Sequence, residues 1–140
     1  MYTYIEPEVA GGLGNDTDID NSVHPPKINK LHYEFADWLG DDIVETFPCY
    51  IVTKNLMLAI IKEGLTGVSF DILKITKSPE FINGFVDLEL ADFHWMKING
   101  VFGIDDFVIA VDYRLLISDK AKKLLNFFNI NYAILEDFVL

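Results

Sequence analysis

Residues 100–125 read "GVFGIDDFVIAVDYRLLISDKAKKLL" and combine the two kinds of secondary structure from which the fold is expected to be built. The apolar runs "FVIAV" and "RLLI" predict one or two buried strands. Ser118 is a residue type that caps helix N-termini, and Asp119 behind it suits the positive end of the helix dipole. The residues that give the following helix its apolar stripe are Ala121, Leu124, Leu125 and Phe128.

Alternation of apolar and polar residues predicts most of the other strands. In "KLHYEF", Leu31, Tyr33 and Phe35 are expected to face inward, and His32 and Glu34 outward. The other segments that predict strands are 1–5, 43–53 (divided or bulged at Pro48), 67–75, 85–90, 93–98 and 132–138.

Two further helices are indicated upstream. Thr53 can cap a helix over residues 54–63 that Gly64 ends, and Ser78 with Pro79 begins a short helical turn. About seven short strands with two or three helices, in no regular βαβ alternation, predict an α+β fold. We expect a single domain over residues 1–140, with a mixed but mainly antiparallel sheet.

Residues 6–29 contain clustered glycine, asparagine and aspartate and end at Pro25 and Pro26. These residue types favour turns and interrupt sheet ladders, so the segment predicts a long loop. The "GGLG" in it has no strand-to-helix context and no lysine placed to meet a phosphate, which argues against a phosphate loop.

The whole composition indicates a globular chain. Hydrophobic residues make up 51% of the 140 residues, and no apolar run approaches the length of a membrane span. The first ten residues lack the basic segment of a signal peptide, and Cys49 has no partner cysteine with which to form a disulfide. A cytoplasmic location is the expectation.

The net charge of −11 is unevenly distributed. Residues 1–26 hold five acids and no lysine or arginine, and residues 80–119 hold eight acids against Lys97 and Arg114, a balance of −6. Such a surface repels nucleic acid and anionic lipid and favours a basic partner, or it serves solubility alone.

No catalytic motif stands out. Cys49 lies between apolar residues, where a buried and inert thiol is expected, and His24, His32 and His94 share no motif. Phosphodiester chemistry is disfavoured because the chain has a single arginine and lacks the lysine expected after "VDLEL". A non-enzyme without a cofactor is the expectation.

Two aspartate pairs leave an alternative open. Asp41–Asp42 and Asp105–Asp106 each follow a glycine-containing turn and precede an apolar run. Converging carboxylates could hold calcium or magnesium, so a small metal-assisted hydrolase is the alternative. Adjacent residues on a strand point to opposite faces, however, and turn or capping chemistry explains the same residues.

Two long segments carry a resemblance to a known family: "EPEVAGGLGNDT…HPPKINKLHYEFADWLGDDIVETFPCYIVT" and "DDFVIAVDYRLLISDKAKKLLNFFNI". Together they resemble the small acidic immunity proteins of bacterial polymorphic toxin systems. The resemblance implies an α+β protein that binds and blocks a toxin encoded beside it, and it transfers no binding residue position by position.

We therefore expect a protein that neutralises a cognate toxin, basic at the contacted surface, by covering its active site or substrate cleft. Nucleic acid and membrane are not expected partners, and weak homodimerisation through edge strands is a further alternative. The residues predicted to contact the partner are Asp105, Asp106, Asp87, Glu89 and Asp92, with Trp38, Asp41 and Asp42 as a second patch.

Overall fold

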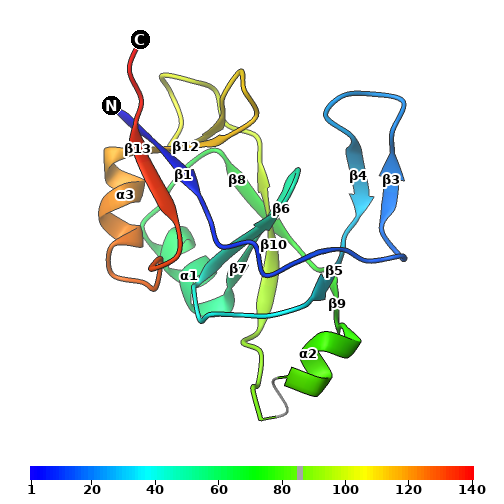
Figure 1. Cartoon of the computed structure of the whole chain (residues 1–140). Helices are drawn as coiled ribbons and strands as arrows, with labels where there is room; N and C mark the ends of the chain where they lie inside the picture. The colour runs from blue at the N-terminus through cyan, green and yellow to red at the C-terminus, as the bar shows by residue number, and fades with distance from the viewer. Residues whose placement is uncertain (85–86) are drawn as a thin grey trace.

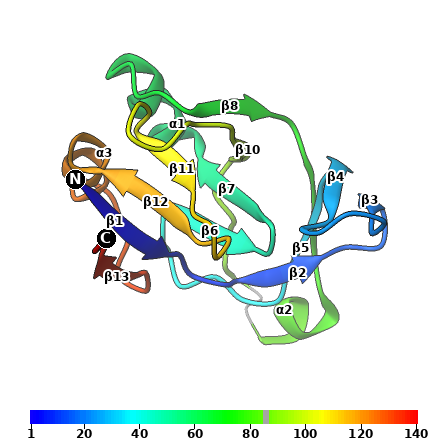
Figure 2. The same ribbon diagram turned by 90° about the horizontal axis from the view of Figure 1, so that it is seen from above.

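The computed structural model describes residues 1–84 and 87–140. It is a single α+β domain in which the described residues form thirteen short strands and three helices (Figure 1). The predicted fold class is confirmed, although the strands are more numerous than the expected seven. The two chain ends lie together beside α3 (Asp119–Leu125), on the side of the molecule opposite the β3–β4 hairpin (Figures 1 and 2).

The first sheet has the order β11-β12-β1-β13, and all its pairs are antiparallel. Its central strand is the N-terminal segment, which pairs with the last strand of the chain. The bounds of its strands are β11 Phe107–Ile109, β12 Leu115–Ser118, β1 Tyr2–Glu6 and β13 Ile134–Asp137.

The second sheet, β6-β7-β10-β8, lies at the centre of the domain and is also antiparallel. Every residue of β7 is buried, because Tyr50 and Val52 contribute to one hydrophobic cluster and Cys49 and Ile51 to another. The bounds are β6 Ile43–Thr46, β7 Cys49–Thr53, β10 Phe93–Ile98 and β8 Val68–Asp71. The expected division at Pro48 is confirmed, since the chain turns there between β6 and β7.

A third sheet covers the other face of the second. In it β5 (His32–Phe35) pairs antiparallel with β2 (Gly11–Leu13) and parallel with β9 (Lys74–Lys77). The β3–β4 hairpin (Asp18–Asp20 and Lys27–Lys30) stands beside it. This mixture of pairings agrees with the expectation of a mixed, mainly antiparallel arrangement.

Two helices begin at the predicted caps. The Thr53 hydroxyl accepts a hydrogen bond from the Leu56 N–H at the start of α1 (Lys54–Lys62). Ser118 does the same for the Ala121 N–H of α3. The third helix, α2 (Pro79–Gly84), is short and lies at the lower end of the molecule in Figure 1.

Residues 6–29, which the sequence predicts as a long loop, contain β2, β3 and the start of β4. This part of the prediction is therefore corrected. Two of the glycines in this segment, Gly11 and Gly14, lie where the backbone closely approaches β5. A Cβ on Gly11 would stand 1.9 Å from the Glu34 carbonyl oxygen, and one on Gly14 would stand 2.1 Å from the His32 ring. Only glycine lets this segment pack so closely on β5.

His32, expected on the polar face of its strand, is 6% exposed. Its Nδ1 accepts a hydrogen bond from the Asp16 N–H at 3.1 Å, and its Nε2 lies 2.7 Å from the Thr76 hydroxyl. The outer face of β5 is therefore covered by the segment that the sequence predicted as loop.

The strand expected over residues 85–90 is also corrected in part. Residues 85 and 86 lie outside the described residues, and residues 87–90 are not in a strand. The alternation is nevertheless real, because Asp87 and Glu89 are exposed while Leu88 and Leu90 pack against the second hydrophobic cluster. The period-two pattern correctly indicated which side chains of residues 87–90 face solvent. It did not show that these residues would pair with another strand, and they do not.

Candidate binding surface

The Asp41–Asp42 turn stabilises the fold and is not an exposed patch. Asp41 is 0% exposed, and its carboxylate accepts hydrogen bonds from the backbone N–H groups of Asn131 (3.0 Å) and Tyr132 (2.8 Å). Asp42 accepts from the Thr53 hydroxyl at 2.8 Å and from the Asn129 N–H at 2.7 Å. These bonds join the turn before β6 to the segment before β13, and they leave the Asp41 side chain buried and not at the surface where the predicted second patch would place it.

Asp105 and Asp106 are also engaged within the chain. The Asp105 carboxylate accepts from the Val101 N–H at 2.7 Å. Asp106 accepts from the Thr66 N–H at 2.8 Å and from the Ser118 hydroxyl at 2.6 Å, and these bonds hold its pKa below the usual range against the opposing effect of burial. The pair marks the turn that feeds β11, and both side chains remain half-buried.

The structure separates the predicted acidic block into two distant groups. Asp105 and Asp106 follow β10 in the chain, whereas Asp87, Glu89 and Asp92 precede it. A strand advances about 3.3 Å per residue, so the length of β10 stands between the two groups. Figure 1 shows the loop after β10 at the upper end of the molecule and residues 87–92 at the lower end.

Trp38 packs against the same part of the molecule as the segment that holds Asp87, Glu89 and Asp92. Its ring lies 5.4 Å, centroid to centroid, from the ring of Phe93, the first residue of β10, and packs against the same hydrophobic cluster as Leu88 and Leu90. Trp38, predicted as an exposed anchor, is half-buried, and its Nε1–H donates to the Asp41 carbonyl oxygen at 2.9 Å. The ring therefore has a fixed position with one part open to solvent.

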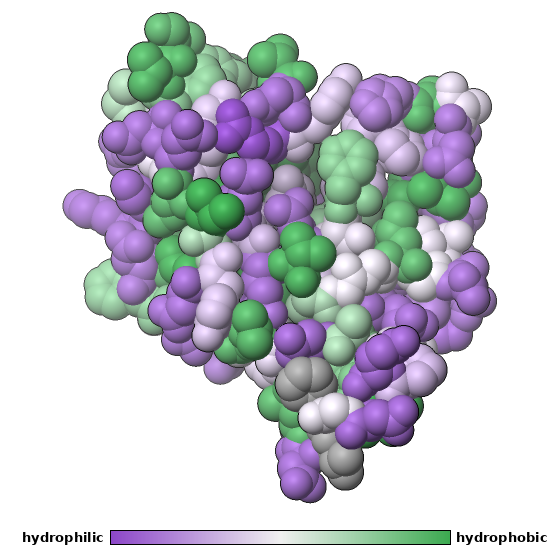
Figure 3. All heavy atoms as spheres, viewed as in Figure 1, coloured by the Kyte–Doolittle hydropathy of each residue, from purple (hydrophilic) through white to green (hydrophobic). Residues whose placement is uncertain are grey.

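We use the name acidic face for the residues that the structure brings together here: Trp38, Asp87, Leu88, Glu89, Leu90 and Asp92. Asp87 and Glu89 are exposed and make no ion pair with other described residues, and Asp92 lies 3.5 Å from His94 Nε2. The backbone carbonyl of Asp92 accepts from the Lys54 N–H at 2.7 Å, which fixes one end of the loop. Figure 3 shows hydrophilic and apolar residues interleaved at this lower end.

Glu8 supports the turn that carries Trp38, a role that no local sequence pattern indicates. Its carboxylate accepts from the Leu39 N–H at 2.7 Å and lies 3.4 Å from the Asp41 N–H. The side chain is 5% exposed, and burial raises its pKa despite those two hydrogen bonds. A glutamate in a loop-like segment has no local signature for such a contact, which is made across more than thirty residues of chain.

A second carboxyl with a raised pKa, that of the half-buried Glu45, lies on β6. Burial, reinforced by the charge of Glu6, raises the pKa of Glu45 from 4.5 to about 7. Glu45 is directly opposite Tyr50 in the β6–β7 pairing, and its backbone carbonyl accepts from the Tyr33 hydroxyl at 3.0 Å. The group lies between sheets, away from the acidic face.

The residue types considered for chemistry are dispersed. Burial raises the pKa of the Cys49 thiol to about 12, so the thiol stays protonated at neutral pH. Among residues 1–84 and 87–140, no three His, Cys, Asp or Glu side chains gather as metal ligands would. The oxygens of the aspartate pairs, which the metal alternative requires, already accept the backbone and hydroxyl hydrogen bonds described above.

In the part of the chain that the structure describes, no helix has the length and apolar character needed to cross a membrane. Comparisons with protein-family models, with curated proteins and with solved structures found no match to this chain.

Proposed function

We propose that this chain is an immunity protein: it binds a protein toxin in the cytoplasm and blocks it by covering a basic active site or substrate cleft. The observation that carries the proposal is the acidic face. In it, Asp87 and Glu89 are exposed and have no partner among the described residues, and a half-buried tryptophan and two leucines pack against one hydrophobic cluster. An apolar centre with a charged rim is the usual anatomy of a specific interface. The resemblance to immunity proteins and the net charge of −11 support the same proposal.

The acidic residues fall into two groups, and only one of them is free to contact a partner under this proposal. Asp41, Asp42, Asp105 and Asp106 accept hydrogen bonds that hold turns, so their carboxylates contribute to the fold. Asp87 and Glu89 make no such bonds with the other described residues, so no contact in the described part of the fold uses their charge. Unpaired carboxylates beside an aromatic anchor steer a basic protein toward the face and speed association.

The test uses the protein encoded beside this chain as the candidate toxin. Association is measured by biolayer interferometry in low and in high salt, together with the toxin's activity at increasing amounts of this chain. We expect tight binding and stoichiometric loss of activity. Asp87→Lys combined with Glu89→Lys should slow association by about tenfold or more in low salt and by much less in high salt.

The matched control is Glu63→Lys combined with Asp137→Lys. It changes the net charge by the same amount at two exposed acids whose side chains make no hydrogen bond or ion pair with other described residues. Equal slowing by both double variants would show that only total charge matters and would remove the acidic face from the proposal. A candidate toxin that neither binds nor loses activity would contradict the proposed function itself.

A further inference from the structure

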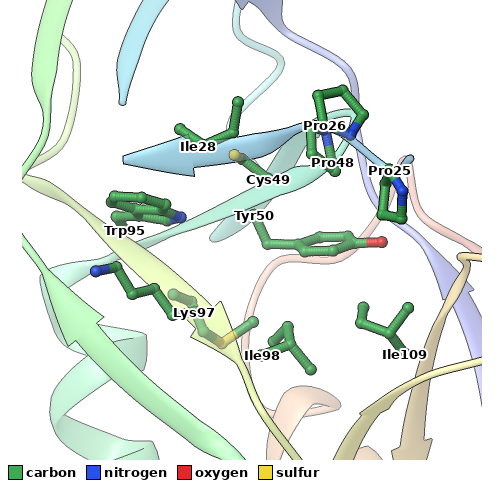
Figure 4. Close-up of a pocket in the computed structure, with 11 residues that line it drawn as sticks. Pro25, Pro26, Ile28, Pro48, Cys49, Tyr50, Trp95, Lys97, Ile98 and Ile109 are labelled. Atoms are coloured by element: carbon green, nitrogen blue, oxygen red, sulfur yellow. The ribbon is translucent and has the colours of Figure 1, made fainter. Parts of the chain in front are cut away.

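A groove of about 310 Å³ opens between the second sheet and the strand β4 with the prolines that precede it (Figure 4). Its walls include the rings of Tyr50 and Trp95, the side chains of Ile98 and Ile109, and Pro25. The volume lies at the lower end of the range for small-molecule sites, and such sites are mostly apolar with a few polar groups. The groove is separate from the acidic face.

The indole N–H of Trp95 is the notable polar group in the groove. Trp95 is 6% exposed, yet its Nε1 makes no hydrogen bond with any other described residue. Figure 4 shows this nitrogen directed into the groove, toward Cys49 and Tyr50. The other tryptophan, Trp38, satisfies its Nε1 with a backbone carbonyl, which makes the contrast informative. This nitrogen is open to the groove and not enclosed by protein atoms, so an acceptor on an incoming molecule can take the place of water there.

The residues that line the groove indicate which hydrogen-bond acceptor on a bound molecule would fit. The chain has 22 acidic residues against 11 basic ones, but no aspartate or glutamate is among the described residues that line the groove. The one charged residue in the lining is Lys97, whose ammonium lies 4.4 Å from the centre of the Trp95 ring and 2.9 Å from the Asp71 carboxylate. Burial raises the pKa of the Tyr50 phenol, so this hydroxyl remains protonated as a second donor. The groove therefore offers hydrogen-bond donors and has no carboxylate in its described lining, while the charge of Lys97 is already paired with Asp71.

We propose that this groove binds a small, mostly apolar molecule through a carbonyl or carboxylate oxygen that accepts a hydrogen bond from Trp95 Nε1. The apolar part packs between the Tyr50 ring and the isoleucine side chains, and the oxygen reaches the indole N–H. The inference is independent of toxin binding.

The experiment follows the two indole N–H signals in ¹H–¹⁵N correlation spectra of the full chain. Phenylacetate, phenylacetamide and toluene are the probes: the first carries a carboxylate, the second a neutral carbonyl and the third no acceptor. Trp38→Phe assigns the two signals. We expect the Trp95 signal to move saturably with the two acceptor-bearing probes at concentrations up to about 20 mM, while the Trp38 signal stays in place. A larger response to phenylacetate than to phenylacetamide would identify the ligand as a carboxylate.

Two variants locate the binding. Ile109→Phe fills the groove from its rim and should weaken binding by about tenfold or more. Val111→Phe makes a similar enlargement two residues away, at a side chain that is 97% exposed and outside the groove, and should bind as the unmodified chain does. The unchanged Trp38 signal reports that each variant is folded.

The proposal is overturned if the Trp95 signal is unmoved by both acceptor-bearing probes, or if toluene moves it as far as they do. Equal binding by the Ile109→Phe variant and the unmodified chain would also overturn it, because the contact would then lie elsewhere.

Discussion

At the scale of single residues, Glu45 is the carboxyl that burial and the charge of Glu6 bring to a pKa of about 7. A carboxyl whose pKa is raised in the folded state disfavours folding when it ionises. Its penalty is absent below the ordinary value of 4.5, grows as the pH rises toward about 7, and is complete above that. The stability of the chain therefore carries a cost at neutral and alkaline pH that a neutral side chain would avoid.

We predict that Glu45→Gln stabilises the chain at pH 8 by on the order of 2 kcal/mol and changes its stability much less at pH 5. Urea unfolding at both pH values measures the difference between variant and unmodified chain. Glu63→Gln, at an exposed helix end, serves as the control and should give similar differences at the two pH values. A Gln variant equally stabilised at pH 5 and pH 8 would show that ionisation of Glu45 is not the cause.

Single residues also illustrate how far the local sequence can indicate a side chain's role. The aspartate pairs were recognised as turn residues or ligands, but the partners of Asp41 lie 90 and 91 residues further along the chain. No local pattern signals a contact of that length, so the sequence could not distinguish the buried Asp41 from the exposed Asp87. Trp38 is predicted as an exposed anchor near acids, but its half-burial depends on Phe93 and on the turn held by Glu8.

At the scale of elements, the correct predictions are those with a local physical cause. Thr53 and Ser118 cap the two longer helices, and the alternation in residues 93–98 matches β10 over its full length. The strands missed in residues 6–29 are three or four residues long, and each has a single apolar side chain larger than glycine, which is too little for an alternating pattern. They form because Gly11 allows a close approach to β5 and because β3 and β4 pair with each other.

The cap of α3 provides a test at this scale, since Ser118 has two roles. Its hydroxyl accepts from the Ala121 N–H at 3.1 Å and donates to the Asp106 carboxylate at 2.6 Å. We predict that Ser118→Ala lowers the free energy of unfolding by about 1–2 kcal/mol, because the helix loses its cap and the carboxylate loses a donor. Chemical denaturation measures the change.

The conservative variant Ser118→Thr keeps a hydroxyl at the cap and should recover most of that loss. A Thr variant as unstable as the Ala variant would attribute the effect to packing around the residue rather than to its hydrogen bonds.

At the scale of the whole molecule, the acids fall into those that the fold uses and those that it does not. Asp71 pairs with Lys97, Asp16 pairs with Lys74, and Arg114 binds the carboxylates of Asp112 and Glu136. Asp87 and Glu89 have no counterpart of this kind among the described residues. In a chain with a net charge of −11, unpaired carboxylates add repulsion to the folded state. Natural proteins accept local conflicts of this sort mainly where function requires them.

Neutralising the unpaired acids and neutralising the paired acids should therefore change the melting temperature differently. Asp87→Asn combined with Glu89→Gln should raise the melting temperature in about 10 mM salt, because repulsion is relieved, and the rise should shrink at about 0.5 M salt, where charges are screened. Asp16→Asn combined with Asp71→Asn removes the same amount of charge but breaks two ion pairs, so it should give no comparable rise. Thermal unfolding followed by circular dichroism in the two salt concentrations measures both. If the first double variant melts at a lower temperature than the unmodified chain, the carboxylates at 87 and 89 support the fold, and the view that they are retained for a partner is wrong.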